Sequence, residues 1–166
     1  MLFEGPAGWA EWSPFPEYGD EEAAAWLRAA LETATLGHPR AVRETVEVNG
    51  IVPALPPREA ARRAVDSGCR TIKIKVAVNG RPLDDDIARV AAVRDALPEA
   101  RLRVDANGGW TREEARIAIA ELAGFGLEYV EQPSPTVEDL AWLRALDQGS
   151  PSPRTNPSGG QTTRCG

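Results

Sequence analysis

Strict alternation of strand-like and helix-like segments is the feature that most constrains how this chain can fold. From residue 45 onward, short runs rich in Val, Ile and Leu are each followed by an amphipathic stretch, through four successive units. The expected strands cover 45–52, 71–77, 101–106 and 127–131, and the expected helices cover 56–67, 84–97, 111–123 and 136–146. Such alternation is typical of a parallel sheet, in either a (β/α) barrel or a doubly wound fold.

The two ends of the chain follow other patterns. Residues 8–12 read as a short strand, and residues 20–36 as an amphipathic helix that Asp20 caps and Gly37 ends. Residues 147–166 are rich in Ser, Pro, Gly and Thr and have no apolar periodicity, so we expect them to be disordered.

Composition excludes several classes of function. The net charge of -6 repels phosphate backbones, which argues against nucleic-acid binding. No run approaches 18 apolar residues, so no membrane span is expected, and the first residues lack the plan of a signal peptide. Cys69 and Cys165 have no Cys/His cluster near them and are interpreted as free thiols in a reducing compartment, the cytoplasm. His38 lies in a Gly-His-Pro turn and is interpreted as a surface residue.

The second expected strand carries two lysines on one face. Side chains alternate along a strand, so Lys73 and Lys75 share the face opposite Ile72 and Ile74. A lysine face inside a covered sheet is costly unless opposite charges pair with it. Taken alone, an edge strand with a solvated lysine face explains the pattern equally well.

The next two strands end in carboxylates. Asp105 follows Lys75 by 30 residues and Glu131 follows Asp105 by 26, each about one strand–helix unit. This spacing places an amine and two carboxylates at the carboxyl ends of consecutive parallel strands, where barrel enzymes carry their active sites. Oxygen ligands on adjacent strand ends suit a hard cation such as Mg²⁺, and a lysine near that cation is a candidate base. A helix cap at Asp105 and a surface acid at Glu131 are the structural alternatives.

Three motifs in this order resemble the enolase superfamily, and within it the actinobacterial o-succinylbenzoate synthases. They are the Lys-x-Lys of Lys73 and Lys75, Val-Asp-Ala-Asn-Gly-Gly-Trp at 104–110, and Tyr-Val-Glu-Gln-Pro at 129–133. A segment at 5–18 is similar to the capping domain of these enzymes, and the likeness extends to about residue 146.

The resemblance implies a fold and a set of roles. It implies a partial (β/α) barrel of about four units at 45–146, preceded at 1–44 by a remnant of an α+β capping domain. Asp105 and Glu131 would bind one Mg²⁺, Lys75 would be the acid/base residue, Lys73 would support it electrostatically, and Asn107 would contact the substrate or lie just behind the metal. The implied reaction is dehydration of a cyclohexadiene carboxylate through an enediolate in menaquinone biosynthesis.

Several parts of the family pattern have no counterpart in this chain. Family members have eight barrel strands, a third metal carboxylate and a second catalytic lysine on the opposite side, for which this chain offers no candidate. We therefore expect the 166-residue polypeptide to be inactive or nearly so, and its open strand edges to favour self-association.

A shifted reading frame is one hypothesis for the tail. If the codons of residues 150–157 are read in a frame shifted by two bases, they permit the sequence Pro-Val-Ala-Ala-Asp-Glu-Ser. This sequence is similar to the family segment that holds the third metal carboxylate, an aspartate.

Other functions stay open. A muconate cycloisomerase or a dipeptide epimerase would share these lysines and acids, and a non-catalytic half barrel could act as an assembly module. A doubly wound nucleotide-binding domain is disfavoured because no Gly-x-Gly-x-x-Gly follows the first strand.

Overall fold

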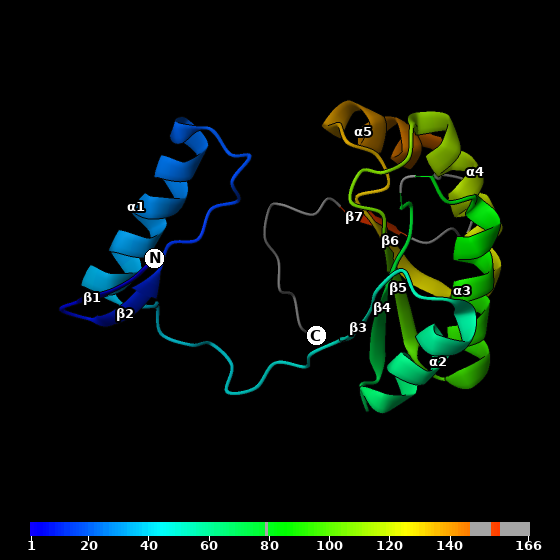
Figure 1. The fold of residues 1–166 in the computed structure, drawn as a ribbon, viewed down its shortest axis with the longest axis horizontal. Coiled ribbons are helices and arrows are strands. Elements are labelled where there is room, and N and C mark those ends of the chain that lie inside the picture. The colour runs from blue at the N-terminus through cyan, green and yellow to red at the C-terminus, as the bar shows by residue number, and fades with distance from the viewer. Residues whose placement is uncertain (79, 147–153, 157–166) are drawn as a thin grey trace. The chain divides into compact units, whose positions relative to one another are not determined.

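The computed structural model describes residues 1–78, 80–146 and 154–156, in which two compact units are distinguished (Figure 1). The first unit extends to Val46 and the second begins at Glu47.

The first unit is a β-hairpin packed on one helix. Strands β1 (Leu2–Gly5) and β2 (Gly8–Glu11) are antiparallel, and helix α1 (Asp20–Leu36) contacts them through small side chains. The buried residues of this contact are Ala10, Ala30 and Ala34. A Cβ atom on Gly5 would come within 2.5 Å of the carbonyl oxygen of Ala34, so glycine is needed where the helix approaches the hairpin.

The second unit contains a sheet whose described strands are all parallel. In sheet order they are β3 (Gly50–Val52), β4 (Thr71–Lys75), β5 (Arg101–Asp105), β6 (Leu127–Glu131) and β7 (Arg154–Asn156). The connecting helices are α2 (Pro57–Asp66), α3 (Leu83–Ala96), α4 (Arg112–Leu122) and α5 (Val137–Leu146), with the 3₁₀ turn η1 (Ala123–Phe125) after α4. Helices α2, α3 and α4 form a layer beside the sheet (Figure 1).

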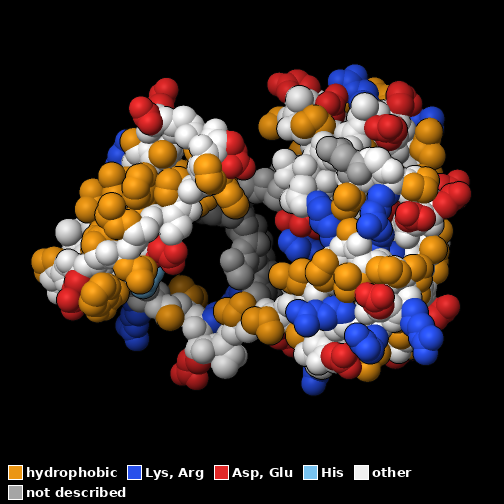
Figure 2. All heavy atoms as spheres, viewed as in Figure 1, with side chains coloured by type: hydrophobic (Ala, Val, Ile, Leu, Met, Phe, Trp, Pro, Cys, Tyr) orange, Lys and Arg blue, Asp and Glu red, His pale blue; other side chains and the backbone are white. Residues whose placement is uncertain are grey.

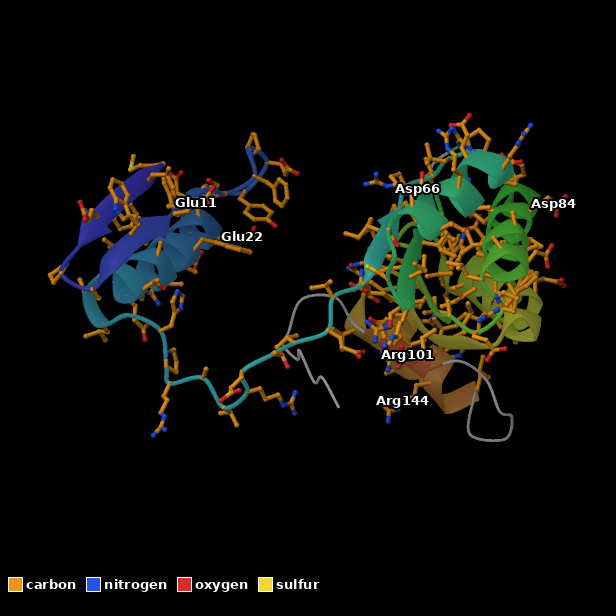
Figure 3. All side chains as sticks on the ribbon, turned by 90° about the horizontal axis from the view of Figure 1, so that it is seen from below. Glu11, Glu22, Asp66, Asp84, Arg101 and Arg144 are labelled. Atoms are coloured by element: carbon orange, nitrogen blue, oxygen red, sulfur yellow. The ribbon has the colours of Figure 1, made fainter. Side chains whose placement is uncertain are left out.

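The core of the second unit lies between the strands and these helices, where side chains pack densely (Figure 3). Alternate strand residues are fully buried there: Val52, Ile72, Ile74, Leu102, Val104 and Val130. The helices contribute small and branched side chains to the same core: Ala60, Ala64, Val90, Val93, Ala115, Ala118 and Leu122. Asp66 on α2 and Asp84 on α3 are exposed (Figure 3), and acidic and basic groups are interspersed over the surface (Figure 2).

The intervening strand residues point to the opposite side of the sheet, which we call the open face. It carries Lys73, Lys75, Arg103, Asp105, Tyr129 and Glu131. The described strands form an open sheet, as expected for part of a barrel.

The expected strand–helix alternation is confirmed, with small differences at element ends. The strand expected at 45–52 is limited to Gly50–Val52, because β4 begins at Thr71 and its pairing with β3 starts at Gly50 and Ile72. Residues 45–49 therefore have no neighbouring strand to pair with.

Other expectations need correction in the first unit and the tail. Asp20 is the first residue of α1, and Gly19 is its N-cap, with no side-chain hydrogen bond. Strand β1 was not expected, because Leu2–Gly5 is too short to show an alternating pattern. The tail expected to be disordered lies mostly outside the described residues, but Arg154–Asn156 forms β7, since the free edge of β6 offers backbone partners.

Two further expectations concern the thiols and the membrane. Cys69 is a partly buried free thiol, and Cys165 lies outside the described residues. None of the helices in the described part of the chain has the length and apolar character needed to cross a membrane.

Candidate functional site

The carboxyl ends of three neighbouring strands bring the expected functional residues into one row. Lys75 on β4 pairs in register with Asp105 on β5, and Asp105 pairs with Glu131 on β6. Each is the last residue of its strand, and all three lie on the open face. The structure thus places these residues, which we call the strand-end row, side by side at the edge where parallel-sheet enzymes bind substrates.

Lys73 lies one pleat below this row and bridges its two carboxylates. Its Nζ lies 3.2 Å from Oδ2 of Asp105 and 3.3 Å from Oε2 of Glu131. Burial by itself lowers the pKa of Lys73, but the carboxylates of Glu131 and Asp105 outweigh burial, and the pKa is raised above its ordinary value. Two carboxylate oxygens from different strands therefore converge on one positive charge.

Lys75 has different surroundings and a pKa displaced the other way. Burial lowers the pKa of Lys75 below its ordinary value; the charge of Asp105 opposes this shift and that of Lys73 adds to it. The Lys75 ammonium donates a hydrogen bond to Oδ1 of Asn107. The backbone N–H of Asn107 in turn donates to Oδ1 of Asp105 at 3.1 Å, so Asn107 connects the lysine to the carboxylate.

The backbone leaves each of the three strands through a left-handed residue. The φ angles are 59° at Ala77, 46° at Asn107 and 39° at Gln132. Asparagine tolerates this region, whereas each of the other two costs about 1–3 kcal/mol. The loop after β5 holds the arrangement in place: Gly108 N–H donates to the carbonyl of Gln132 at 2.7 Å, and a Cβ atom on Gly109 would collide with the carbonyl oxygen of Ala77.

Sequence reasoning missed a buried ion pair next to this edge. Asp86 and Arg89 on α3 contact each other, and Arg89 donates to the carbonyl of Lys75. A signal was present, because Asp86, Arg89, Val90 and Val93 follow the i, i+3, i+4, i+7 spacing of one buried helix face. Two charged residues on such a face indicate a paired, enclosed interaction.

Sequence reasoning also missed the charged layers of the open face below the row. Arg103, which pairs in register with Lys73, forms a 2.6 Å ion pair with Glu128 and lies over the ring of Tyr129. Arg101 donates to Oγ1 of Thr71 at 3.1 Å. Arg103 is thereby paired away from the two lysines, so the carboxylates of the strand-end row remain available to Lys73.

The site combines two carboxylates, which contact the Lys73 ammonium, with two lysines whose pKa values are displaced in opposite directions. Lys73 and Lys75 are the two lysines of the whole sequence, so every lysine side chain lies at this edge of the sheet. Within the described ranges, no group of three or more His, Cys, Asp or Glu side chains is arranged to hold a metal ion. Residues whose environments displace their pKa values in opposite directions are typical of acid–base sites.

Comparison with known families identifies two matching segments. Residues 57–153 match the family described as enolase C-terminal domain-like, and residues 1–34 match the family described as enolase N-terminal domain-like.

Curated relatives share one name. The chain is 54% identical over 145 residues to an o-succinylbenzoate synthase from Thermobifida fusca, which covers 87% of this chain and 46% of the relative. It is 51% identical over 146 residues to the o-succinylbenzoate synthase of Mycolicibacterium smegmatis, covering 87% and 45%. The chain spans about half the length of the curated relatives it matches.

Solved structures of other proteins have a similar fold over part of this chain. A dipeptide epimerase from Enterococcus faecalis is 34% identical, with a TM-score of 0.55 over 61% of this chain and 30% of that protein. A mandelate racemase/muconate lactonizing enzyme from Roseiflexus is 33% identical, with a TM-score of 0.56 over 62% and 32%.

Proposed function

This chain belongs to the enolase C-terminal domain-like family, and from that premise we propose that it carries the lysine and metal-binding part of an o-succinylbenzoate synthase active site. The observation that carries the proposal is the position of Lys73 between the carboxylates of Asp105 and Glu131, with Lys75 at the end of the same strand. The shared name of the curated relatives, o-succinylbenzoate synthase, supports the class of reaction. We infer that the substrate is a small cyclohexadiene carboxylate and that the enzyme is a cytoplasmic lyase.

Asp105 and Glu131 are the residues that would hold Mg²⁺. They fit this ion because their oxygens converge on one cationic point and because carboxylates are the ligands that Mg²⁺ prefers. When bound, Mg²⁺ supplies positive charge next to the substrate carboxylate, where negative charge develops as a proton leaves the α carbon. Superfamily enzymes combine a lysine base with Mg²⁺ in this way.

Lys75 is the proton acceptor in this proposal. Its neutral amine takes the proton from the carbon α to the substrate carboxylate, which leaves an enediolate. The electron pair of the broken C–H bond then forms the new C=C bond as hydroxide leaves the adjacent carbon. The proton on Lys75 and the departing hydroxide together account for the water that is lost. The lowered pKa of Lys75 favours the neutral amine, and Asn107 orients it by accepting its hydrogen bond.

Lys73 has a complementary role. Its raised pKa keeps it protonated, so it adds fixed positive charge beside the carboxylates and cannot compete with Lys75 as a base. Residues 1–44 would be the remnant of a capping domain and residues 45–146 the first half of a barrel; the match of residues 1–34 to the N-terminal family supports this division.

A chimeric enzyme tests the proposal. Residues 2–146 of this chain would replace the matching segment of the Thermobifida fusca enzyme, and Mg²⁺-dependent formation of o-succinylbenzoate would be measured. We expect turnover that falls about 10²- to 10⁴-fold with Lys75→Arg, which keeps the positive charge but cannot act as a base. Arg101→Lys is the control and should retain activity, because Arg101 lies at the opposite end of β5 from Asp105. Equal turnover with and without Lys75 would refute the assignment.

A dipeptide epimerase activity is the second candidate, because the solved epimerase shares 34% identity and epimerisation begins with the same proton abstraction. The same residues inserted into the Enterococcus faecalis enzyme would be assayed for epimerisation. Activity in this background, together with none in the synthase background, would favour the second candidate.

A further inference from the structure

Helix α3 carries an ion pair that the protein encloses completely. Asp86 and Arg89 are 2% and 1% exposed, and Oδ1 of Asp86 lies 2.5 Å from Nη1 of Arg89. Enclosing two charges is costly, and replacing such a pair by apolar residues is often neutral or stabilising. Stability alone is therefore a weak reason for the pair, and its other contacts indicate its role.

These contacts reach the ends of two strands. Arg89 donates from Nη1 to the carbonyl of Lys75 at 3.1 Å and from Nε to the carbonyl of Leu55 at 2.7 Å. Asp86 accepts at Oδ2 from the backbone N–H of Ala77 at 2.9 Å. The pair thus binds the main chain on both sides of Val76, just where β4 ends.

The same contacts support the loop after β5. Ala77 has the left-handed φ of 59°, which an alanine adopts only when its surroundings impose it. Gly109 packs directly on the carbonyl of Ala77, so the position of Ala77 limits where this loop can lie. The loop carries Asn107, which accepts the hydrogen bond from the Lys75 amine.

We propose that Asp86 and Arg89 are positioning residues for Lys75: Arg89 fixes its main chain, and Asp86 fixes the Ala77 backbone against which the Asn107 loop packs. The inference rests on the proposed role of Lys75 as the proton acceptor. The contacts of the Asp86–Arg89 pair do not involve the carboxylates of Asp105 or Glu131, so the positioning role is separate from metal binding.

A second arginine on α3 provides a matched comparison. Arg94 donates to the carbonyls of Phe125 at 3.0 Å, Ala100 at 2.8 Å and Pro98 at 2.9 Å. These acceptors lie near the amino ends of β5 and β6, away from the lysines. Arg89 thus contacts main chain at the carboxyl end of β4, whereas Arg94 makes similar contacts near the amino ends of β5 and β6.

Selective labelling gives a direct test on the full chain. Because the sequence contains two lysines, ¹³C-labelled lysine yields carbonyl and Cε resonances from Lys73 and Lys75 alone, which Lys73→Arg assigns. We expect Arg89→Gln to shift both Lys75 resonances and leave those of Lys73 in place, because glutamine is too short to donate to the carbonyls of Leu55 and Lys75 together. Arg94→Gln, with a comparable loss of urea resistance, should leave the Lys75 resonances unchanged. Unchanged Lys75 resonances in Arg89→Gln, or equal shifts in both variants, would overturn the proposal.

A double variant covers the case in which Arg89→Gln does not fold. Asp86→Asn with Arg89→Met removes both charges, keeps an acceptor for Ala77 N–H and leaves no uncompensated buried charge. Folding of this variant with displaced Lys75 resonances supports the positioning role. Folding with unchanged resonances, or failure to fold, contradicts it, since the pair would then have no effect on Lys75 or be needed for folding itself. The readout requires neither Mg²⁺ nor turnover, so a failure of the positioning role can be distinguished from a failure of the proposed function.

Discussion

Lys73 and Lys75 lie two residues apart on one face of one strand, yet their pKa values are displaced in opposite directions. Both side chains lose solvent, which disfavours the ammonium form. For Lys73, the two carboxylates that contact it stabilise the ammonium form by more than burial destabilises it. Lys75 contacts the neutral amide of Asn107 instead. Lys73 is thereby kept charged, whereas Lys75 loses its proton more readily than an ordinary lysine.

The order of deprotonation follows from these shifts. In ¹³C-lysine spectra recorded against pH, we expect Lys75 to titrate below the ordinary lysine pKa of about 10.4 and Lys73 above it. Because the folded-state pKa of Lys73 is raised, its contribution to stability is fully present below the ordinary pKa and is lost as pH rises through the folded value. Titration of Lys73 before Lys75 would contradict this account of the site.

The sequence predicted these residues but not their contacts. Alternation along the strand placed Lys73 and Lys75 on one face, and the spacing to Asp105 and Glu131 placed all of them at neighbouring strand ends. Which carboxylate meets which amine depends on strand register, and a shift of two residues would keep the same alternation. The pKa directions therefore follow only from the three-dimensional arrangement.

At the scale of elements, the loop after β5 is the segment on which the site geometry depends. It leaves the strand through left-handed Asn107 and then packs Gly109 against Ala77 at the end of β4. The contact joins the exits of β4 and β5, so we expect a disturbance at either exit to affect both Lys75 and Asn107.

Substitution of Gly109 tests this packing. We expect Gly109→Ala to lower the free energy of unfolding by about 1–3 kcal/mol, because its Cβ collides with backbone that cannot easily move. Gly124→Ala is the matched control, since no atom lies within 4 Å of a Cβ there. Urea unfolding measures both variants, and equal stability of Gly109→Ala and the unsubstituted chain would show that the loop is not tightly packed.

Element types were more predictable than element ends. The runs at β4, β5 and β6 are long and apolar enough to show their period, and all three strands were expected. β1 and the short extent of β3 depend on a partner strand, and periodicity within a segment carries no information about partners. The Asp86–Arg89 pair was missed because charged residues in a helix usually face solvent.

At the scale of the whole molecule, the described residues place two carboxylates and two lysines on the open face, and the chain spans about half the length of its curated relatives. In the proposed function these residues would supply one part of a site. We expect the open face and the sheet edges to favour contact with another chain.

The isolated polypeptide tests this view. We expect the purified 166-residue chain to show no measurable Mg²⁺-dependent dehydration, because the described carboxylates alone do not enclose a metal ion. Light scattering on the same sample separates the alternatives: a defined dimer supports an assembly module, whereas a heterogeneous aggregate does not. Turnover by the monomer would show that these residues suffice.

The coding sequence tests the hypothesis of a shifted frame. We expect the other frame from codon 140 onward to read Ala-Ala-Asp-Glu-Ser across the region of residues 150–157 and to continue into further strand–helix units. This region includes β7, the strand that pairs with β6. Stop codons or an unrelated sequence in that frame would show that the tail is genuine.

Titration with Mg²⁺ tests the central claim most directly, namely that Asp105 and Glu131 form a cation site beside the two lysines. With ¹³C-labelled lysine, MgCl₂ should move the Lys73 resonances saturably, because a divalent cation competes with the ammonium for both carboxylates; NaCl of equal ionic strength should not. Asp105→Asn and Glu131→Gln should abolish the response, and Glu128→Gln, on the same strand but paired with Arg103, should retain it. No response, or an equal response in Glu131→Gln, would contradict the claim.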